Sequence, residues 1–320
     1  MSKPAAPILI GIDVSKDELV IARSDSNTVE ALSNNVAAIR RWLHALPDGC
    51  QFALEATGTY HRAVAQLAFS QGHRVYLLDG FRLNRYRDSI GTRAKTDQTD
   101  ARLILRYLSN EGDNLKPWTP PPQAYDRIHA LLHRRATIVQ ARVALNQSLR
   151  DIPESKHLAK QLNRQLKQLE GRIEKHLESC CREAGWWDQV SRCKKIEGIG
   201  TFNAMALTTM FQRGRFKNSD AFIAFLGLDV RVRDSGKKTG ARKLTKKGDP
   251  ELRRLLHNAA MSARRTKRWA STYERYRARG LGTIQVLVIL ARKLARIAFA
   301  LLRNGTTYQP NRAGETCAST

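Results

Sequence analysis

The sequence predicts an α/β domain at the N-terminal end of the chain and a mainly α-helical remainder, and three observations support this prediction. Short apolar runs alternate with amphipathic helical segments through the first hundred residues, which is typical of an α/β domain. A proline-rich stretch at residues 116–122 then indicates a stiff, extended linker. Beyond it, apolar residues recur at helical spacing, so we expect helices from there on.

The first domain is expected to contain five strands and three helices. In chain order, we expect strands at residues 8–13, 19–22, near Val29, at 52–55 and 75–78, and helices at 39–46, 60–69 and 97–108. The first three strands should form an antiparallel meander. The resulting order, β-β-β-α-β-α-β-α, is that of the RNase H-like nuclease fold, to which RuvC-like enzymes belong. We therefore predict an RNase H-like domain over residues 1–116.

The rest of the chain is expected to form two helical regions, a linker and arm over residues 117–190 and a C-terminal domain over 191–320. Apolar residues recur at helical spacing over 128–149 and again over 158–177, with Pro153 between the two stretches. Two long amphipathic helices joined by a break favour an antiparallel coiled-coil arm. The same stripes would also suit the core of a helix bundle, and periodicity alone does not separate the two interpretations.

Positive charge is the strongest compositional feature. The 320 residues contain 55 Lys and Arg against 29 Asp and Glu, a net charge of +26, which makes a polyanion the expected partner. The excess is uneven, because residues 194–320 hold 27 basic and 8 acidic residues while residues 1–116 are nearly balanced. A surface that only keeps the protein in solution would mix both signs. Nucleic acid binding is therefore expected mainly in the last third.

Cysteines, histidines and apolar runs exclude several other classes of protein. The five cysteines contain no Cys-x-x-Cys pair or zinc-type spacing, so we expect reduced thiols in a cytoplasmic protein. The N-terminal residues lack a signal peptide's apolar core, and the apolar run at 286–291 is too short to span a bilayer. Apart from His61, which follows Glu55 closely, the histidines are expected to be scattered without ligand spacing.

Four acidic residues predict a metal site. Asp13 and Glu55 each end an apolar run, so their carboxylates should project from the ends of buried strands. Asp97 and Asp100 have an i, i+3 spacing that places them on one helical face, with Cβ atoms about 5–6 Å apart. Oxygen ligands suit Mg²⁺, and a pair of such ions can hold the attacking and leaving oxygens of a phosphate ester. Any one of these residues alone would more simply be a solvated or capping carboxylate.

The motifs around these residues resemble one family. They are GIDVSK at residues 11–16, EATGTY at 55–60 and KTDQTDA at 95–101. In this order they resemble the signature of the IS110 family of insertion-sequence transposases, relatives of the Piv DNA invertase. The resemblance covers nearly the whole chain. It implies a RuvC-like domain with a DEDD carboxylate set, a coiled coil and a C-terminal transposase domain.

The C-terminal third supplies a second part of the resemblance. Its motifs are FIAFLGL at residues 222–228, RVRDSG at 231–236 and GARKLTKKG at 240–248. In the transposase domain of the family, the serine before the first of these glycines is the nucleophile, and that serine maps onto Ser235. Without the family, Asp-Ser-Gly indicates only a turn. A serine hydroxyl also needs a base, a metal or a cationic field before it attacks.

Basic residues around Ser235 are candidates for contacts with DNA phosphates, and some of them for stabilising the charge of a phosphoryl transition state. They are Arg231, Arg233, Lys237, Lys238, Arg242, Lys243, Lys246 and Lys247.

A Gly-x-Gly turn formed by Gly198 and Gly200 resembles a helix-hairpin-helix turn, whose backbone N–H groups can bind a phosphate. The same pattern also occurs in ordinary turns.

The resemblance implies a DNA transposase or recombinase that cuts and rejoins strands through a covalent phosphoserine intermediate. Mg²⁺, or Mn²⁺ as a substitute, would be bound by Asp13, Glu55, Asp97 and Asp100. The expected partners are donor and target DNA, a structured noncoding bridge RNA that guides recognition, and further copies of the chain in a tetramer, a dimer of dimers. Domains of different subunits would then complete each active site in the bacterial cytoplasm.

Two other hypotheses remain open from the sequence. A junction-resolving RuvC-like nuclease would use the same carboxylates to activate water, and Ser235 would then be dispensable. A nonenzymatic nucleic-acid-binding protein would have the same charge, with the acidic residues serving only structure. Binding should weaken with salt in all three cases, so salt dependence does not separate them.

Overall fold

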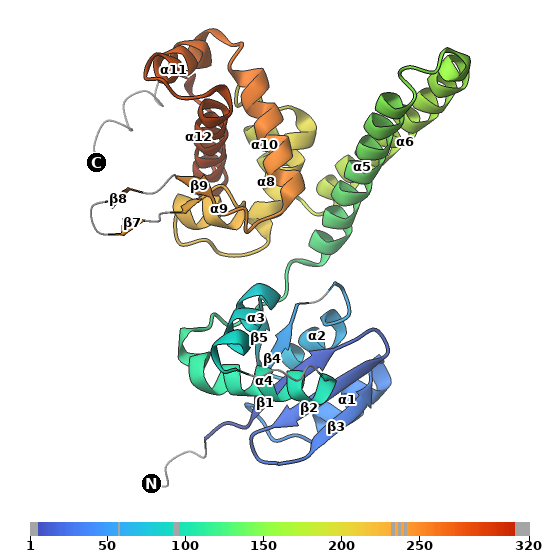
Figure 1. Cartoon of the computed structure of the whole chain (residues 1–320), viewed down its shortest axis with the longest axis vertical. Coiled ribbons are helices and arrows are strands. Elements are labelled where there is room, and N and C mark those ends of the chain that lie inside the picture. The colour runs from blue at the N-terminus through green and yellow to red at the C-terminus, as the bar shows by residue number, and fades with distance from the viewer. Residues whose placement is uncertain are drawn as a thin grey trace. The chain divides into compact units, whose positions relative to one another are not determined.

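Two compact units make up the chain, Met1–Pro120 and Pro121–Thr320 (Figure 1). The computed structural model describes residues 6–56, 58–91, 96–231 and 242–310, together with the backbone of 234, 235, 238 and 239. The division between the units falls inside the predicted proline-rich linker. The second unit contains both the helical arm and the C-terminal helices, whereas the sequence predicts them as two regions.

A five-stranded sheet forms the centre of the first unit. Its strands are β1 (Leu9–Val14), β2 (Glu18–Arg23), β3 (Val29–Ser33), β4 (Gln51–Glu55) and β5 (Arg74–Leu78). They lie in the order β3-β2-β1-β4-β5, with β1, β2 and β3 antiparallel and β4 and β5 parallel to β1. This arrangement is the predicted RNase H-like sheet.

Helices cover both faces of the sheet. The helices of the first unit are α1 (Val36–His44), α2 (Arg62–Ser70), α3 (Gly80–Ser89) and α4 (Asp97–Glu111). Side chains of α1 and α2 share a core with Ile12 and Leu54, whereas those of α4 pack on the opposite face, against Ala53. The sequence does not predict α3. Its only buried residue is Leu83, so it has no apolar periodicity to identify it.

Gly11 in β1 allows α4 to pack unusually close to the sheet. A Cβ atom at this position would lie 2.3 Å from the backbone nitrogen of Leu105 and 2.5 Å from the carbonyl oxygen of Ala101. Both atoms belong to the backbone of α4, so no side-chain rotation could relieve the clash. A residue without a side chain therefore fixes the depth at which the helix lies.

Two long antiparallel helices, α5 (Gln123–Ser148) and α6 (Lys156–Glu183), form the arm, and a short 3-10 turn at Pro153–Ser155 joins them. Ion pairs cross between the helices, from Arg135 to Glu174 at 2.5 Å and from Arg142 to Glu170 at 2.6 Å. The base of the arm shares its apolar core with the helices that follow. The helices of the arm are those predicted, and their coiled-coil packing stays a prediction.

A helical bundle completes the second unit. Its helices are α7 (Trp187–Lys194), α8 (Thr201–Gln212), α9 (Ser219–Phe225), α10 (Pro250–Ala263), α11 (Lys267–Ala278) and α12 (Thr283–Asn304). Between α9 and α10, two short ladders pair β6 (Val230–Arg231) with β9 (Lys243–Leu244) and β7 (Asp234–Ser235) with β8 (Lys238–Thr239). The segment that carries Ser235 is thus an insertion between two helices of a buried helical core.

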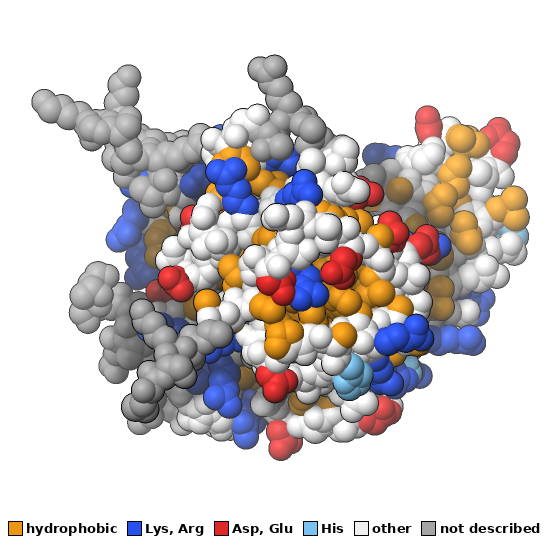
Figure 2. All heavy atoms as spheres, turned by 90° about the horizontal axis from the view of Figure 1, so that it is seen from below, with side chains coloured by type: hydrophobic (Ala, Val, Ile, Leu, Met, Phe, Trp, Pro, Cys, Tyr) orange, Lys and Arg blue, Asp and Glu red, His pale blue; other side chains and the backbone are white. Residues whose placement is uncertain are grey.

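Charges of both signs occur on the surface that Figure 2 shows, where acidic and basic side chains lie among exposed hydrophobic ones. No helix in the described part of the chain combines the length and the apolar character that crossing a membrane would need.

Candidate active site

Two of the four predicted carboxylates come from neighbouring parallel strands. Ile12 of β1 lies opposite Leu54 of β4, so Asp13 and Glu55 occupy the next position on each strand. Side chains alternate between the two faces of a strand. Since Ile12 and Leu54 point into the core formed with α1 and α2, Asp13 and Glu55 point to the face that α4 covers.

The other two carboxylates lie in the first turn of α4, which begins at a well-defined cap. The hydroxyl of Thr96 accepts a hydrogen bond from the backbone N–H of Thr99, and the hydroxyl of Thr99 accepts one from the N–H of Thr96. Asp97 and Asp100 follow directly, and negative charge there is favoured by the helix dipole. The helix begins at Asp97, where the sequence predicts it.

Electrostatic coupling joins the four residues into one group. Burial, followed by the negative charges of Asp100, Asp97 and Glu55, raises the pKa of Asp13 from 3.8 to about 6, against a lowering hydrogen bond from the Val14 backbone. Such repulsion is the condition under which a bound cation is most favourable. The structure thus places carboxylates from three distant segments close enough for their charges to act on one another.

Arg87 of α3 is a charged neighbour of this group that the sequence does not predict. Its guanidinium lies 2.7 Å from the carboxylate of Asp100, and both side chains are largely buried. The pair anchors one carboxylate and leaves the repulsion at Asp13 in place. Because α3 has no apolar periodicity, nothing in the local sequence indicates this contact.

Gly80, the first residue of α3, is a second neighbour that the sequence does not reveal. A Cβ atom there would lie 2.3 Å from Oε1 of Glu55. Asp79 caps the same helix by accepting a hydrogen bond from the backbone N–H of Arg82 at 3.0 Å. The Glu55 carboxylate therefore occupies space that only a glycine leaves open.

The donor set fits a hard divalent cation. All four candidate ligands are carboxylates, and the structure places them where their negative charges oppose one another. Oxygen donors of this kind suit Mg²⁺ or Mn²⁺ better than zinc or copper.

Comparison with known proteins decides the family. Residues 10–157 match a family model described as a transposase with the DEDD domain of IS110, and residues 190–275 match one described as the IS116/IS110/IS902 transposase family. The chain belongs to the IS110/IS116 family of transposases. The first match contains all four carboxylates, and the second contains Ser235.

Curated relatives match this IS110/IS116 family member over nearly their whole length. The pilin gene-inverting protein of Moraxella lacunata is 25% identical over 93% of this chain and 97% of the relative. The transposase for insertion sequence element IS1328 of Yersinia enterocolitica is 26% identical over 94% and 98%. RuvC of T. thermophilus, solved with a Holliday junction substrate, is 16% identical over 35% of this chain and 100% of RuvC, with a TM-score of 0.27. The assignment of an RNase H-like fold here rests on the order and direction of the strands.

The Ser235 segment of the transposase domain is anchored at its base by two glycines in close contact. A Cβ atom at Gly227, where φ is +69°, would lie 2.5 Å from the backbone nitrogen of Gly248. Arg253 of α10 donates a hydrogen bond to the carbonyl oxygen of Gly248 at 2.5 Å, and Thr245 bonds to Asp229. The two ends of this segment are therefore held together on the helical core.

Ser235 itself lies in β7, opposite Lys238 of β8. The structure describes the backbone of both residues, and their side chains lie outside the described part, as do Arg233 and Lys237. Their predicted roles remain predictions.

The other basic residues predicted to bind phosphate flank that segment. Arg231 and Lys243 pair across the β6–β9 ladder, and both are exposed. Arg242 and Lys247 are also exposed, while Lys246 has the positive φ of 58° that permits a sharp turn. Exposed cations close together in space are consistent with the predicted contact with a nucleic acid backbone.

The two glycines of the predicted helix-hairpin-helix-like turn have different surroundings. At Gly198, where φ is +88°, a Cβ atom would lie 2.6 Å from the carbonyl oxygen of Ala259 in α10, so close packing explains this glycine. Gly200 is exposed at the start of α8, with no atom near the position of a Cβ. Its predicted role in phosphate binding stays a prediction.

Histidine spacing requires a correction. The histidines are expected to lack ligand spacing, yet His129 and His133 are one helical turn apart on α5 and both approach Asp249. The i, i+4 spacing was visible in the sequence. Its third partner was not, because it lies 116 positions further along the chain.

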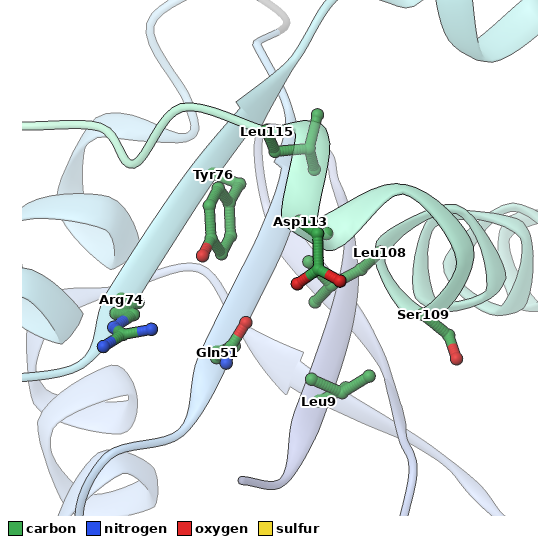
Figure 3. Close-up of a pocket in the computed structure, with 9 residues that line it drawn as sticks. Leu9, Gln51, Arg74, Tyr76, Leu108, Ser109, Asp113 and Leu115 are labelled. Carbon is green, nitrogen blue, oxygen red and sulfur yellow. The ribbon is translucent and has the colours of Figure 1, made fainter.

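A hollow of about 320 Å³ at the other end of the sheet is separate from the candidate active site (Figure 3). Leu9, Gln51 and Arg74 line it from the starts of β1, β4 and β5, with Tyr76 and Asp113 nearby. Asp13 and Glu55 lie toward the opposite ends of β1 and β4.

Proposed function

We propose that this IS110/IS116 transposase cuts and rejoins DNA through Ser235, with Mg²⁺, or Mn²⁺ in its place, bound by Asp13, Glu55, Asp97 and Asp100. The observation that supports the metal site best is the pKa of Asp13, which burial and the negative charges of the other three carboxylates raise to about 6. A divalent cation would relieve this repulsion and would stabilise charge on the oxygens of the reacting phosphate. Arg87 would hold Asp100 in place through their ion pair.

The proposed chemistry conserves the number of phosphate ester bonds. The hydroxyl oxygen of Ser235 attacks a DNA phosphorus atom, a P–O bond to the DNA strand breaks, and the departing oxygen gains a proton. A strand end then attacks the phosphoserine, releases the serine hydroxyl and rejoins the DNA. The exposed cations Arg231, Arg242 and Lys243 would bind the phosphate backbone nearby and favour the developing negative charge.

Partners are part of the same proposal. Donor and target DNA would bind the basic C-terminal third, while a structured noncoding RNA would read sequence by base pairing. Assembly into a tetramer is supported by the apolar residues that the arm exposes, since Leu158 is 68%, Leu162 is 39% and Leu169 is 45% accessible in the single chain. A second copy of the arm would cover such a stripe.

The test of the serine is a trapping experiment on labelled element-end DNA in the presence of Mg²⁺. The wild-type chain should form a covalent protein–DNA adduct, and Ser235→Ala should form none. If the alanine variant still cuts and leaves free strand ends, water is the nucleophile and the chain acts as a RuvC-like nuclease. If Asp13→Asn processes DNA as well as wild type, the carboxylates have no catalytic role.

A further inference from the structure

Three side chains outside the proposed active site bring their donor atoms together at one point. Nε2 of His129 and Nε2 of His133 are 3.3 Å apart. Oδ2 of Asp249 lies 2.8 Å from Nε2 of His133 and 3.4 Å from Nε2 of His129. Among the residues that the structure describes, these three form the group of His, Cys, Asp or Glu side chains in which every donor atom is close enough to the others to share one metal ion.

Two of the three separations between the donor atoms, 3.3 and 3.4 Å, match a tetrahedral metal site, and the third, 2.8 Å, is shorter. Zinc binds imidazole nitrogen at about 2.0–2.1 Å and carboxylate oxygen at about 2.0–2.2 Å, which places neighbouring ligands about 3.3 Å apart at the corners of a tetrahedron. A hydrogen bond between the two imidazole nitrogens would be long at 3.3 Å, and Nε2 of His133 carries at most one proton, which Oδ2 of Asp249 at 2.8 Å can also accept. A cation between the three atoms satisfies all of them.

The surroundings hold each donor in place. Oδ1 of Asp249 accepts a hydrogen bond from the backbone N–H of Glu251 at 2.8 Å, which caps α10 and leaves Oδ2 to the histidines. The ring of His129 stacks on Tyr125, one turn earlier in α5, with ring centroids 5.4 Å apart and planes 12° apart. Fixing the orientation of ligands in this way is typical of metal sites.

We infer that His129, His133 and Asp249 bind a divalent transition metal ion, with zinc as the best match to two imidazoles and one carboxylate. The fourth position is open to water, because the His133 side chain is 44% exposed. The site joins α5, at the base of the arm, to Asp249, the residue that directly precedes α10. Asp249 directly follows Gly248, which closes the segment that carries Ser235. The ion therefore fixes the arm relative to the anchor of that segment.

Metal content of the full-length, untagged chain tests this inference. After equilibration with Zn²⁺ and removal of free ion, mass spectrometry of the metal should find zinc bound to wild type and lost from His133→Ala and Asp249→Asn. His157→Ala, an exposed histidine on α6, is the matched control and should keep its zinc. Asp13→Asn should also keep it, which separates this site from the carboxylates of the first unit.

Two measurements on the wild-type chain keep the test valid if a variant folds poorly. With Mg²⁺ already present in excess, added Zn²⁺ should still raise the melting temperature of wild type and of His157→Ala, since a ligand bound only by the folded state stabilises it. Co²⁺ in place of zinc should give the intense visible absorption of a tetrahedral site. If wild type keeps no zinc, or if His133→Ala keeps as much as wild type, the three residues form only a hydrogen-bonded cluster and the inference is wrong.

Discussion

At the scale of single residues, the candidate active site depends on four carboxylates whose negative charges repel one another. The clearest sign of this repulsion is the raised pKa of Asp13. The sequence predicts all four carboxylates, because each ends a recognisable strand or begins a recognisable helix. It does not predict Arg87 or Gly80, since their contacts with Asp100 and Glu55 arise only when α3 packs beside the sheet. Carboxylates on regular elements can be located from local patterns, whereas their neighbours depend on tertiary structure.

Removing the charge of Asp13 should stabilise the metal-free protein. Asp13→Asn eliminates a buried, repelled carboxylate, so we expect a higher melting temperature without metal and a smaller rise when Mg²⁺ is added. Thermal unfolding with and without Mg²⁺ measures both effects. Asp17→Asn, at an exposed position in the next turn, is the control and should change neither. An unchanged response to Mg²⁺ in Asp13→Asn would contradict the metal site.

The raised pKa of Asp13 also predicts how stability depends on pH. The folded state binds the proton more tightly than the unfolded state, whose pKa is near 3.8, so protonation favours folding. The metal-free wild type should therefore lose stability as the pH rises from about 4 through about 6. Asp13→Asn should lose less over the same range. Equal pH profiles for the two proteins, measured by urea unfolding, would show that Asp13 titrates normally.

Gly80→Ala should separate metal binding from stability. The new methyl group would lie 2.3 Å from Oε1 of Glu55 and displace that carboxylate, so we expect weaker Mg²⁺ binding. Folding itself should be little affected, because alanine suits a helix at least as well as glycine. Calorimetric titration with Mg²⁺ checks this. Gly112→Ala, where a Cβ would meet only ordinary contacts, should bind Mg²⁺ like wild type, and equal affinities in both variants would refute the assignment of Glu55.

At the scale of elements, the position of α4 on β1 determines whether the acidic turn reaches the strand ends. The strands and α4 follow from short apolar runs that alternate with helical segments, so the sequence predicts them. The polar helix α3 offers no such pattern, and the sequence analysis misses it. Close packing at Gly11 is likewise invisible locally, because the clashing atoms are 90 or more positions away in the chain.

Gly11→Ala should destabilise the first unit. The methyl group would collide with the backbone of α4, and overpacking of this kind typically costs about 1–3 kcal/mol. We expect a corresponding loss in the free energy of unfolding by urea, together with weaker Mg²⁺ binding as α4 moves away. Gly112→Ala serves again as the control within the same unit. A loss of stability no larger than that of the control would mean that α4 is not held as the structure has it.

At the scale of the whole molecule, two family domains divide the proposed chemistry, with the carboxylates in one and Ser235 in the other. The charge distribution of the sequence already indicates a nucleic acid partner for the last third of the chain. Subunit assembly is harder to predict from the sequence, because an apolar stripe on a long helix suits both the core of a bundle and an interface between subunits. The exposed leucines of α6 favour the interface.

Complementation tests whether subunits share active sites. Asp13→Asn and Ser235→Ala should each be inactive alone, but their co-expression should restore part of the recombination activity. Restoration occurs because an intact carboxylate set of one subunit can meet the intact serine of another. Asp13→Asn with Asp97→Asn is the matched control and should remain inactive, since every carboxylate set then lacks a member. Failure of the first pair to recover activity would place each complete site within one subunit.

The most direct measurement is the mass of the peptide that carries DNA after reaction with element-end DNA and Mg²⁺. Proteolysis and mass spectrometry should place a nucleotide, joined through a phosphoester, on the peptide that contains Ser235. The adduct should be lost when a chelator removes the metal. Attachment to a different residue, or cleaved strands without any attached peptide, would contradict the proposal that this transposase uses Ser235 as its nucleophile.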